Sequence, residues 1–167
     1  MTSRKFERAT DLEKNMEFMQ AALDLAKAAE REGEVPVGAV IVKDGKVVGQ
    51  GQNRKESLNL ATRHAEIEAI EDASKNLDAW RLEDCDLYVT LEPCLMCAGA
   101  IVASRIKKVY YGTDDPKGGA VKSLYQALND SRLNHKCEVE AGLLKDECSQ
   151  ILKDFFKAKR EKSEAGD

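Results

Sequence analysis

The sequence predicts one α/β domain in which the central sheet begins with an antiparallel hairpin and continues with parallel strands. A length of 167 residues with 43% hydrophobic residues suits a single core. Two β-prone runs flank an Asp-Gly turn, and strands alternate with helices after them. The same hydrophobic content excludes collagen-like, low-complexity and fully disordered chains. Charged residues reach 34%, but the net charge is only −4, which gives no global sign of nucleic-acid binding.

Each element follows from a local pattern. A capping box at Thr10-Asp-Leu-Glu13 and an apolar stripe predict a first helix that ends near Gly33. The type I′ turn signal Asp44-Gly45 joins strands at 37–42 and 46–50. The later elements are a helix at 64–77 with Thr62 as N-cap, a strand at 86–90, an apolar helix at 94–104 opened by Pro93, a strand at 107–111, a helix at 122–128, a strand at 137–140 and a long helix from 143. We expect one domain over residues 10–160, with disordered ends at 1–9 and 161–167.

The sequence contains no pattern typical of membrane insertion or secretion. Its longest apolar run, residues 94–103, has about half the length that a transmembrane helix needs. Polar residues follow the charged N-terminus where a signal peptide would be apolar. The five cysteines are an odd number, and Cys94 and Cys97 lie too close together for a secreted disulfide framework. We therefore expect a cytoplasmic protein with no membrane contact, whose cysteines are reduced or bind a metal.

A glutamate lies on the apolar face of the helix at 64–77. At 100° per residue, Glu66 falls between Ala65, Ala69 and Ala73. A carboxylate placed there loses hydration, which raises its pKa or requires a dedicated partner. The pattern is equally compatible with a side chain that reaches solvent from the first helical turn.

Cys94 and Cys97 are three residues apart on one helical face, near a helix N-terminus that favours thiolates. By itself this C-x-x-C pair fits a redox motif, half of a structural zinc site or part of a catalytic metal site. On an ideal helix His64 and Glu66 point about 200° apart, so both reach one site only beyond the helix N-terminus.

Zinc has two possible arrangements in this sequence. A zinc ion held by His64, Cys94 and Cys97 would keep an open position for water, whereas His135 and Cys137 could instead complete a closed structural site with the C-x-x-C pair.

The spacing His64-Ala-Glu66 followed by Pro93-Cys94-Leu-Met-Cys97 resembles the H-x-E and P-C-x-x-C signature of the zinc nucleobase deaminases. Over residues 13–160 the chain further resembles the bacterial tRNA adenosine deaminase family. The stretches that carry this resemblance are Glu34-Val-Pro-Val-Gly-Ala-Val40, residues 62–69, Leu87-Tyr-Val-Thr-Leu-Glu-Pro-Cys94, Met96-Cys-Ala-Gly-Ala100, Ser104-Arg-Ile106, Lys117-Gly-Gly-Ala120, Ser123-Leu124 and Asp154-Phe-Phe-Lys157.

This resemblance implies a cytidine-deaminase-like fold, a three-layer α/β/α sandwich with a mixed five-stranded sheet, and a homodimer. The implied reaction is hydrolytic deamination of adenosine to inosine at wobble position 34 of tRNA. By the same resemblance, His64, Cys94 and Cys97 bind one Zn²⁺ per subunit. Glu66 would take a proton from the zinc-activated water and deliver it to the base and the leaving ammonia.

The resemblance also implies contacts with the purine and the tRNA anticodon stem-loop by Asn53, Asp115, Lys117 and Asn134. Arg160 belongs to a basic patch at the end of the last helix, with Lys153, Lys157 and Lys159, which is a candidate contact for RNA. Each has an ordinary alternative, as a turn asparagine, a solvated loop residue or a charge at a helix C-terminus. Pro116 stiffens the loop at 114–119, and its two aspartates bring negative charge near phosphate, which departs from the expected pattern.

Two other functions are compatible with the sequence. A deaminase of a free base or nucleotide, such as guanine or cytosine, would keep the zinc chemistry without tRNA. A binding module with a structural zinc would use a closed site and would not need Glu66.

Overall fold

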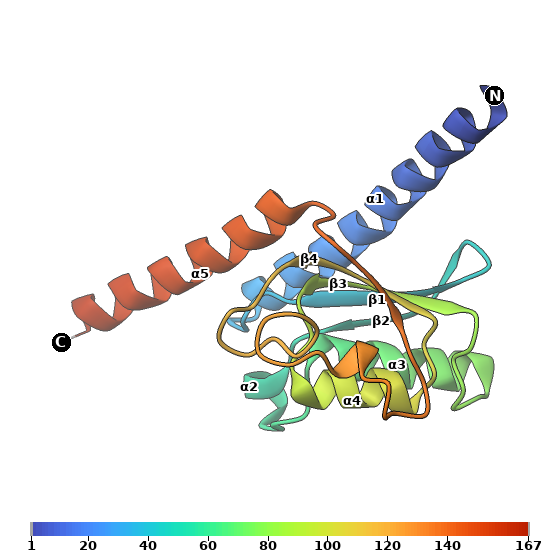
Figure 1. The fold of residues 1–167 in the computed structure, drawn as a ribbon. Coiled ribbons are helices and arrows are strands. Elements are labelled where there is room, and N and C mark those ends of the chain that lie inside the picture. Colours follow the sequence, from blue (N-terminus) through green and yellow to red (C-terminus); the bar gives the residue numbers. More distant parts are fainter. Residues whose placement is uncertain (1, 167) are drawn as a thin grey trace.

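A five-stranded mixed sheet forms the centre of the protein, between two layers of helices (Figure 1). The computed structural model describes residues 2–166, with side chains described from residue 10 onward. The strand order is β2-β1-β3-β4-β5, and β1 pairs antiparallel with β2 and β3, whereas β3, β4 and β5 are parallel. The strands are β1 Gly38–Lys43, β2 Lys46–Gln52, β3 Cys85–Leu91, β4 Lys108–Thr113 and β5 Glu138–Ala141. The predicted hairpin and the parallel strands after it are confirmed.

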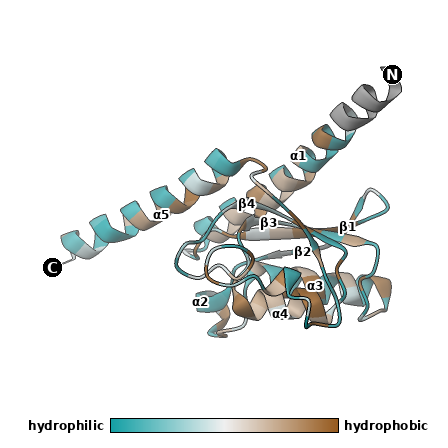
Figure 2. Ribbon diagram, viewed as in Figure 1, coloured by the Kyte–Doolittle hydropathy of each residue, from teal (hydrophilic) through white to brown (hydrophobic). Residues whose placement is uncertain are grey.

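Helices cover both faces of the sheet. α1 (Thr2–Arg31) and α5 (Lys145–Ala165) lie on one face, and α3 (Ala65–Leu77) and α4 (Leu95–Ala103) lie on the other, together with the short α2 (Lys55–Leu58) and the 3₁₀ helix η1 (Ala127–Asn129) (Figure 1). Each face has its own apolar core. Figure 2 shows that α4 is largely hydrophobic, whereas α5 carries mainly hydrophilic residues. This is the expected α/β/α sandwich, and none of the helices within residues 2–166 is long and apolar enough to cross a bilayer.

The edge strand β2 packs closely against α3. A Cβ atom at Gly49 or Gly51 would overlap the backbone of α3, so these two positions require glycine for close approach. Three α3 side chains, each one helical turn after the last, bond the backbone of β2: Glu68 accepts from Gln52 N at 3.3 Å, Asp72 accepts from Gln50 N at 3.0 Å, and Asn76 donates to Val48 O at 2.8 Å. These contacts fix the axis of α3 along the strand and thereby the position of its N-terminus.

The helical ends differ from the sequence expectation. α1 begins at Thr2, so Thr10 lies within the helix and is not its N-cap. Residues 2–9 contain no proline or glycine, and a capping-box pattern inside such a stretch does not interrupt a helix. α5 likewise continues through residues 161–165. The disorder expected at 1–9 and 161–167 stays a prediction, and Met1 and Asp167 lie outside the described residues.

The prediction of a helix at 122–128 is wrong. Residues 120–123 form turns, and only Ala127–Asn129 is helical, as a single 3₁₀ turn. The backbone N–H groups of Val121, Lys122 and Ser123 donate to the carboxylate of Glu92, at the end of β3. They therefore bind a side chain distant in sequence, which the local pattern does not reveal.

Candidate active site

Two helix N-termini bring the predicted metal-binding side chains together. His64 and Cys94 are the N-cap residues of α3 and α4, with extended backbones at φ −81°, ψ 157° and φ −75°, ψ 176°. This corrects the expectation that both residues lie in the first helical turn and that Thr62 is the cap. Because His64 precedes the helix, the ideal angular separation does not apply, and His64 and Glu66 line the same pocket.

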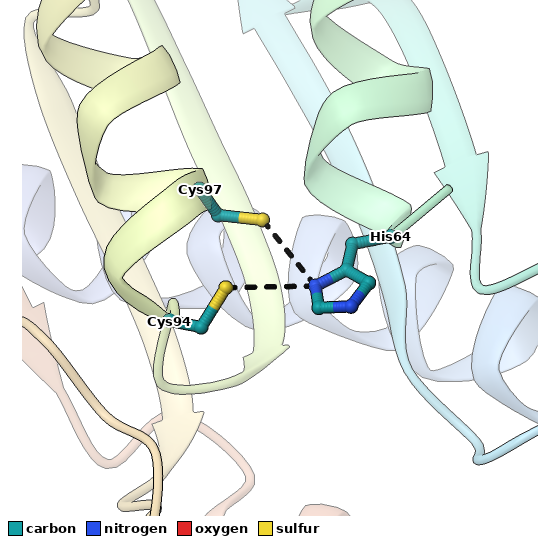
Figure 3. Close-up of side chains that lie close together, drawn as sticks. All are labelled: His64, Cys94 and Cys97. Atoms are coloured by element: carbon teal, nitrogen blue, oxygen red, sulfur yellow. Dashed lines mark hydrogen bonds between the residues drawn. The ribbon is translucent and has the colours of Figure 1, made fainter. Parts of the chain in front are cut away.

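The three side chains form a compact cluster, called here the ligand cluster (Figure 3). His64 Nδ1 lies 3.6 Å from Cys94 Sγ and 3.6 Å from Cys97 Sγ, and all three atoms lie within 4.8 Å of one another. Nitrogen and sulfur ligands at ordinary zinc distances and tetrahedral angles are separated by about 3.6 Å. The ligand cluster therefore fits three corners of a tetrahedral zinc site.

Hydrogen bonds within the ligand cluster shift the pKa of all three of its members. The hydrogen bond from Cys97 and the nearby His64 lower the pKa of Cys94 to about 4 despite its partial burial. The same bond, together with burial, raises the pKa of Cys97. Hydrogen bonding to Cys94 raises the pKa of His64. At neutral pH one thiolate is thus already present, which is the form that binds a metal.

Glu66 lies beside the ligand cluster and is buried. Its side chain faces inward with Ala65, Ala69 and Ala73, as the sequence predicted, and only 3% of its surface is exposed. Burial raises its pKa, and hydrogen bonding with Cys97 opposes this rise only partly. The alternative of a solvated glutamate is therefore wrong. A buried carboxyl group with a raised pKa is suited to take up and release a proton.

The pocket that contains Glu66 adjoins a larger groove, and Val35, Leu91 and Asp115 line both. The pocket has a volume of ≈190 Å³, and the groove, between the loop after β4 and α5, has ≈570 Å³. Lys117, Lys153 and Arg160 line the groove beside an exposed Phe156. Single-stranded nucleic acids bind such surfaces, where cations meet phosphates and an aromatic ring meets bases.

Asn53 lies in the pocket wall, where its amide is partly engaged. Its Nδ2 donates to Val35 O at 3.2 Å, and its Oδ1 accepts from Lys55 N at 3.2 Å. One N–H and one lone pair remain for a ligand. Asn134 lies exposed in the loop after η1 and lines neither the pocket nor the groove, so the structure does not bring it to this site.

The closed structural zinc site is not formed. His135 Nε2 lies 2.7 Å from Ile106 O, and the Cys137 thiol donates to Glu138 O. Within the described residues, neither joins the ligand cluster, which keeps three members.

Comparisons with known proteins agree with this geometry. Residues 13–160 match the family of MafB19-like deaminases. The tRNA-specific adenosine deaminase of Streptococcus pyogenes serotype M1 is 48% identical over 90% of this chain and 88% of its own, and that of Bacillus subtilis is 47% identical over 89% and 92%. A solved structure from a study of A-to-I editing by tRNA:A34 deaminases at the wobble position superposes with a TM-score of 0.79 at 47% identity, covering 81% of this chain and 99% of that one.

The chain belongs to the tRNA-specific adenosine deaminase family. A guanine deaminase from Nitrosomonas europaea shares the fold, with a TM-score of 0.73 over 84% of this chain and 83% of that one, at 23% identity. That similarity concerns the fold alone.

Sequence reasoning missed two buried carboxylates in this deaminase. Glu34 is fully buried and accepts hydrogen bonds from the backbone of Glu56 and Ser57, where α2 begins. Burial alone would raise the pKa of Glu92, but donors from Ser123, Lys122 and Asp115 outweigh it and lower the pKa to about 2. The available signal was an acidic residue directly beside an apolar strand.

Proposed function

We propose that the protein catalyses hydrolytic deamination of adenosine to inosine at the wobble position of tRNA. The observation that carries this proposal is the buried Glu66 beside a three-membered His-Cys-Cys cluster, in a pocket that adjoins a groove lined by three cations and two aspartates. The relatives at 47–48% identity are named for this activity, whereas the free-base deaminase resembles the chain only in fold.

His64, Cys94 and Cys97 are proposed to hold one Zn²⁺ per chain. The 3.6 Å separations support zinc, because they match the spacing of tetrahedral nitrogen and sulfur ligands. When bound with three protein ligands, zinc lowers the pKa of a water molecule at its open position. Two thiolates also offset the charge of the ion.

Glu66 is proposed to move the proton. Its carboxylate accepts one proton from the attacking water and delivers it to the purine ring nitrogen, where it stays. It then takes the remaining proton of the hydroxyl added at C6 and delivers it to the amino group, which leaves as ammonia while the C6–O bond becomes the carbonyl of inosine. The raised pKa supports this role, because a carboxyl group that holds its proton nearer neutral pH exchanges it more readily in both directions.

The substrate is proposed to enter along the groove. Asn53 would hydrogen-bond the purine in the pocket, and Asp115 would border the entering nucleotide. Lys117 and Arg160 would contact phosphates of the anticodon stem-loop, next to Lys153. Asn134 keeps this role only by resemblance, since it lies outside both hollows.

We also propose a cytoplasmic homodimer. Exposed apolar side chains of Leu95, Tyr125 and Leu133 line one hollow at the start of α4, with exposed Leu124 beside Tyr125 in sequence. A second copy of the chain would cover this patch. Sedimentation of the purified protein tests this, and a cytoplasmic location follows from the substrate.

Inosine formation on a full-length tRNA with adenosine at the wobble position tests the function directly. The wild-type protein should form inosine, Glu66→Ala should not, and both should contain zinc. Free guanine, cytosine and their nucleotides serve as competing substrates. Ammonia release from a free base with no change in the tRNA would replace the substrate assignment, and zinc binding with no deamination would favour the structural-zinc module.

A further inference from the structure

The carboxylate of Glu92 accepts hydrogen bonds from residues along the loop at 115–123. Only 2% of this residue is exposed, and none of the ion pairs among the described side chains includes it. It accepts five hydrogen bonds instead, all from residues 115–123: Asp115 N at 3.0 Å and Ser123 Oγ at 2.5 Å on Oε1, and Val121 N at 3.1 Å, Lys122 N at 2.9 Å and Ser123 N at 3.0 Å on Oε2.

A buried carboxylate without a cation is costly unless both oxygens are fully hydrogen-bonded. Here the donors are mostly backbone N–H groups, so the loop must adopt one path to supply them. Gly119 lies on that path, and a Cβ atom there would overlap the carboxylate of Glu92. The conformation of residues 115–123 is thus determined by the side chain that directly follows β3.

Glu92 also connects this loop to the ligand cluster. Pro93 and Cys94 follow it directly, Ala120 N donates to Pro93 O at 2.8 Å, and Cys94 and Gly119 form a β-bridge. Asp115, which Glu92 holds by its backbone, lines both the pocket and the groove. One carboxylate therefore sets the distance between the start of α4 and the wall that faces the substrate.

We propose that Glu92 is a positioning residue whose carboxylate folds residues 115–123 into the wall that orients the anticodon loop over the ligand cluster. This inference rests on the proposed function. Glu92 lines the pocket, but both of its oxygens are bonded by residues 115–123, so we assign it a role through Asp115 and the loop backbone.

The variant Glu92→Gln distinguishes the two oxygens of the carboxylate. A glutamine has one acceptor oxygen, and we expect it to keep the three N–H groups of residues 121–123 that bond Oε2 in the wild type. The Nε2 group then faces the N–H of Asp115, so two donors oppose each other and Asp115 is released. Ser123→Ala is the milder variant, because it removes one hydroxyl donor and keeps the charge.

The first measurement is single-turnover inosine formation at a series of tRNA concentrations. For Glu92→Gln we expect the half-saturating concentration to rise by about tenfold or more, with the rate at saturation within about threefold of wild type. Zinc content should be unchanged. Glu83→Gln, an exposed acid paired with Arg81, is the charge-matched control. An unchanged half-saturating concentration, or a fall confined to the saturated rate, would overturn the proposal.

Hydrogen exchange of the free protein provides the second measurement. In Glu92→Gln the amides of residues 115–123 should exchange faster, while those of α3 keep their protection. Equal loss in both regions would indicate general destabilisation and contradict the proposal. If Glu92→Gln does not fold, Ser123→Ala decides by the same two readouts, with smaller shifts expected in the same direction.

The two proposals fail in different ways. If the wild type forms no inosine, the proposed function is wrong, and the role of Glu92 toward tRNA is wrong with it. If the wild type edits tRNA while Glu92→Gln and Ser123→Ala behave like wild type in both measurements, only the role of Glu92 is wrong.

Discussion

The ligand cluster and the loop at 114–126 face the same pocket but are held in different ways. His64, Cys94 and Cys97 sit at or near helix N-termini, so their placement follows from the residues immediately around them. The loop has little regular structure, and its path depends on Glu92, more than twenty residues earlier. Local sequence spacing thus determines the arrangement of the ligand cluster, whereas a buried contact between distant residues determines the path of the loop beside it.

The largest effect should come from the ligand cluster itself. Cys97→Ala removes one of three ligands, so we expect zinc content to fall to near zero and inosine formation to fall to background. Cys137→Ala is the matched control, since this buried thiol bonds Glu138 O elsewhere. Zinc analysis and the tRNA assay check both variants. Equal zinc loss in Cys137→Ala would instead support the closed structural zinc site with His135 and Cys137.

Removal of the metal should expose a single reactive thiol. The pKa of Cys94 is lowered to about 4, so in zinc-free protein its thiolate is present above that pH and is lost as the pH falls through about 4. The pKa of Cys137 and of Cys148 is raised by burial to about 12, so both stay protonated.

Alkylation at pH 6 followed by peptide mass analysis should therefore label Cys94 alone. Zinc-loaded protein is the control and should resist labelling. Predominant labelling of Cys97 would contradict the described proton arrangement.

A smaller effect is expected from a substitution in the loop at residues 115–123, which forms the wall beside the pocket. Gly119→Ala places a Cβ atom against the carboxylate of Glu92 and so displaces the loop. We expect kcat/KM on tRNA to fall by about 10–100-fold with zinc retained. Gly99→Ala is the control, because a Cβ there meets no atom within 4 Å. Loss of zinc in Gly119→Ala would show that the wall and the ligand cluster are not separable.

The smallest effect should come from the groove. Arg160→Ala removes one exposed cation, so binding of tRNA should weaken by a few-fold, and the slope of log affinity against log salt should decrease by about one. Arg81→Ala, at an exposed site beside Trp80, is the control. An unchanged salt slope in Arg160→Ala would exclude a phosphate contact at this position.

The sequence was sufficient for the antiparallel hairpin and for the parallel strands after it, because both rest on short-range periodicity. Periodicity also placed Glu66 on the apolar face of its helix, but it left burial and exposure to solvent open until the structure showed burial. Asp44 and Gly45 have φ angles of 51° and 75°, as the predicted type I′ turn requires. The helix predicted at 122–128 failed, since its N–H groups bond Glu92 instead. No local pattern contains that contact.

The placement of the residues proposed to contact the substrate was predictable only in part. Asn53 and Asp115 line the pocket, and Lys117 and Arg160 line the groove, which is compatible with the proposed contacts. Asn134 does not, because its place depends on the path of a loop with few regular hydrogen bonds. The extended backbone of His64 could not be predicted either, since the sequence pattern does not distinguish an N-cap residue from a residue of the first helical turn.

The three side chains that α3 extends to β2 have a consequence for how the protein associates. An open strand edge offers unpaired N–H and C=O groups on which another chain can add a strand and begin to aggregate. Glu68, Asp72 and Asn76 already bond that edge. At the opposite edge, β5 has only four residues and carries Glu138 and Glu140. Both margins of the sheet thus resist strand addition, so any contact between copies would involve helices and loops.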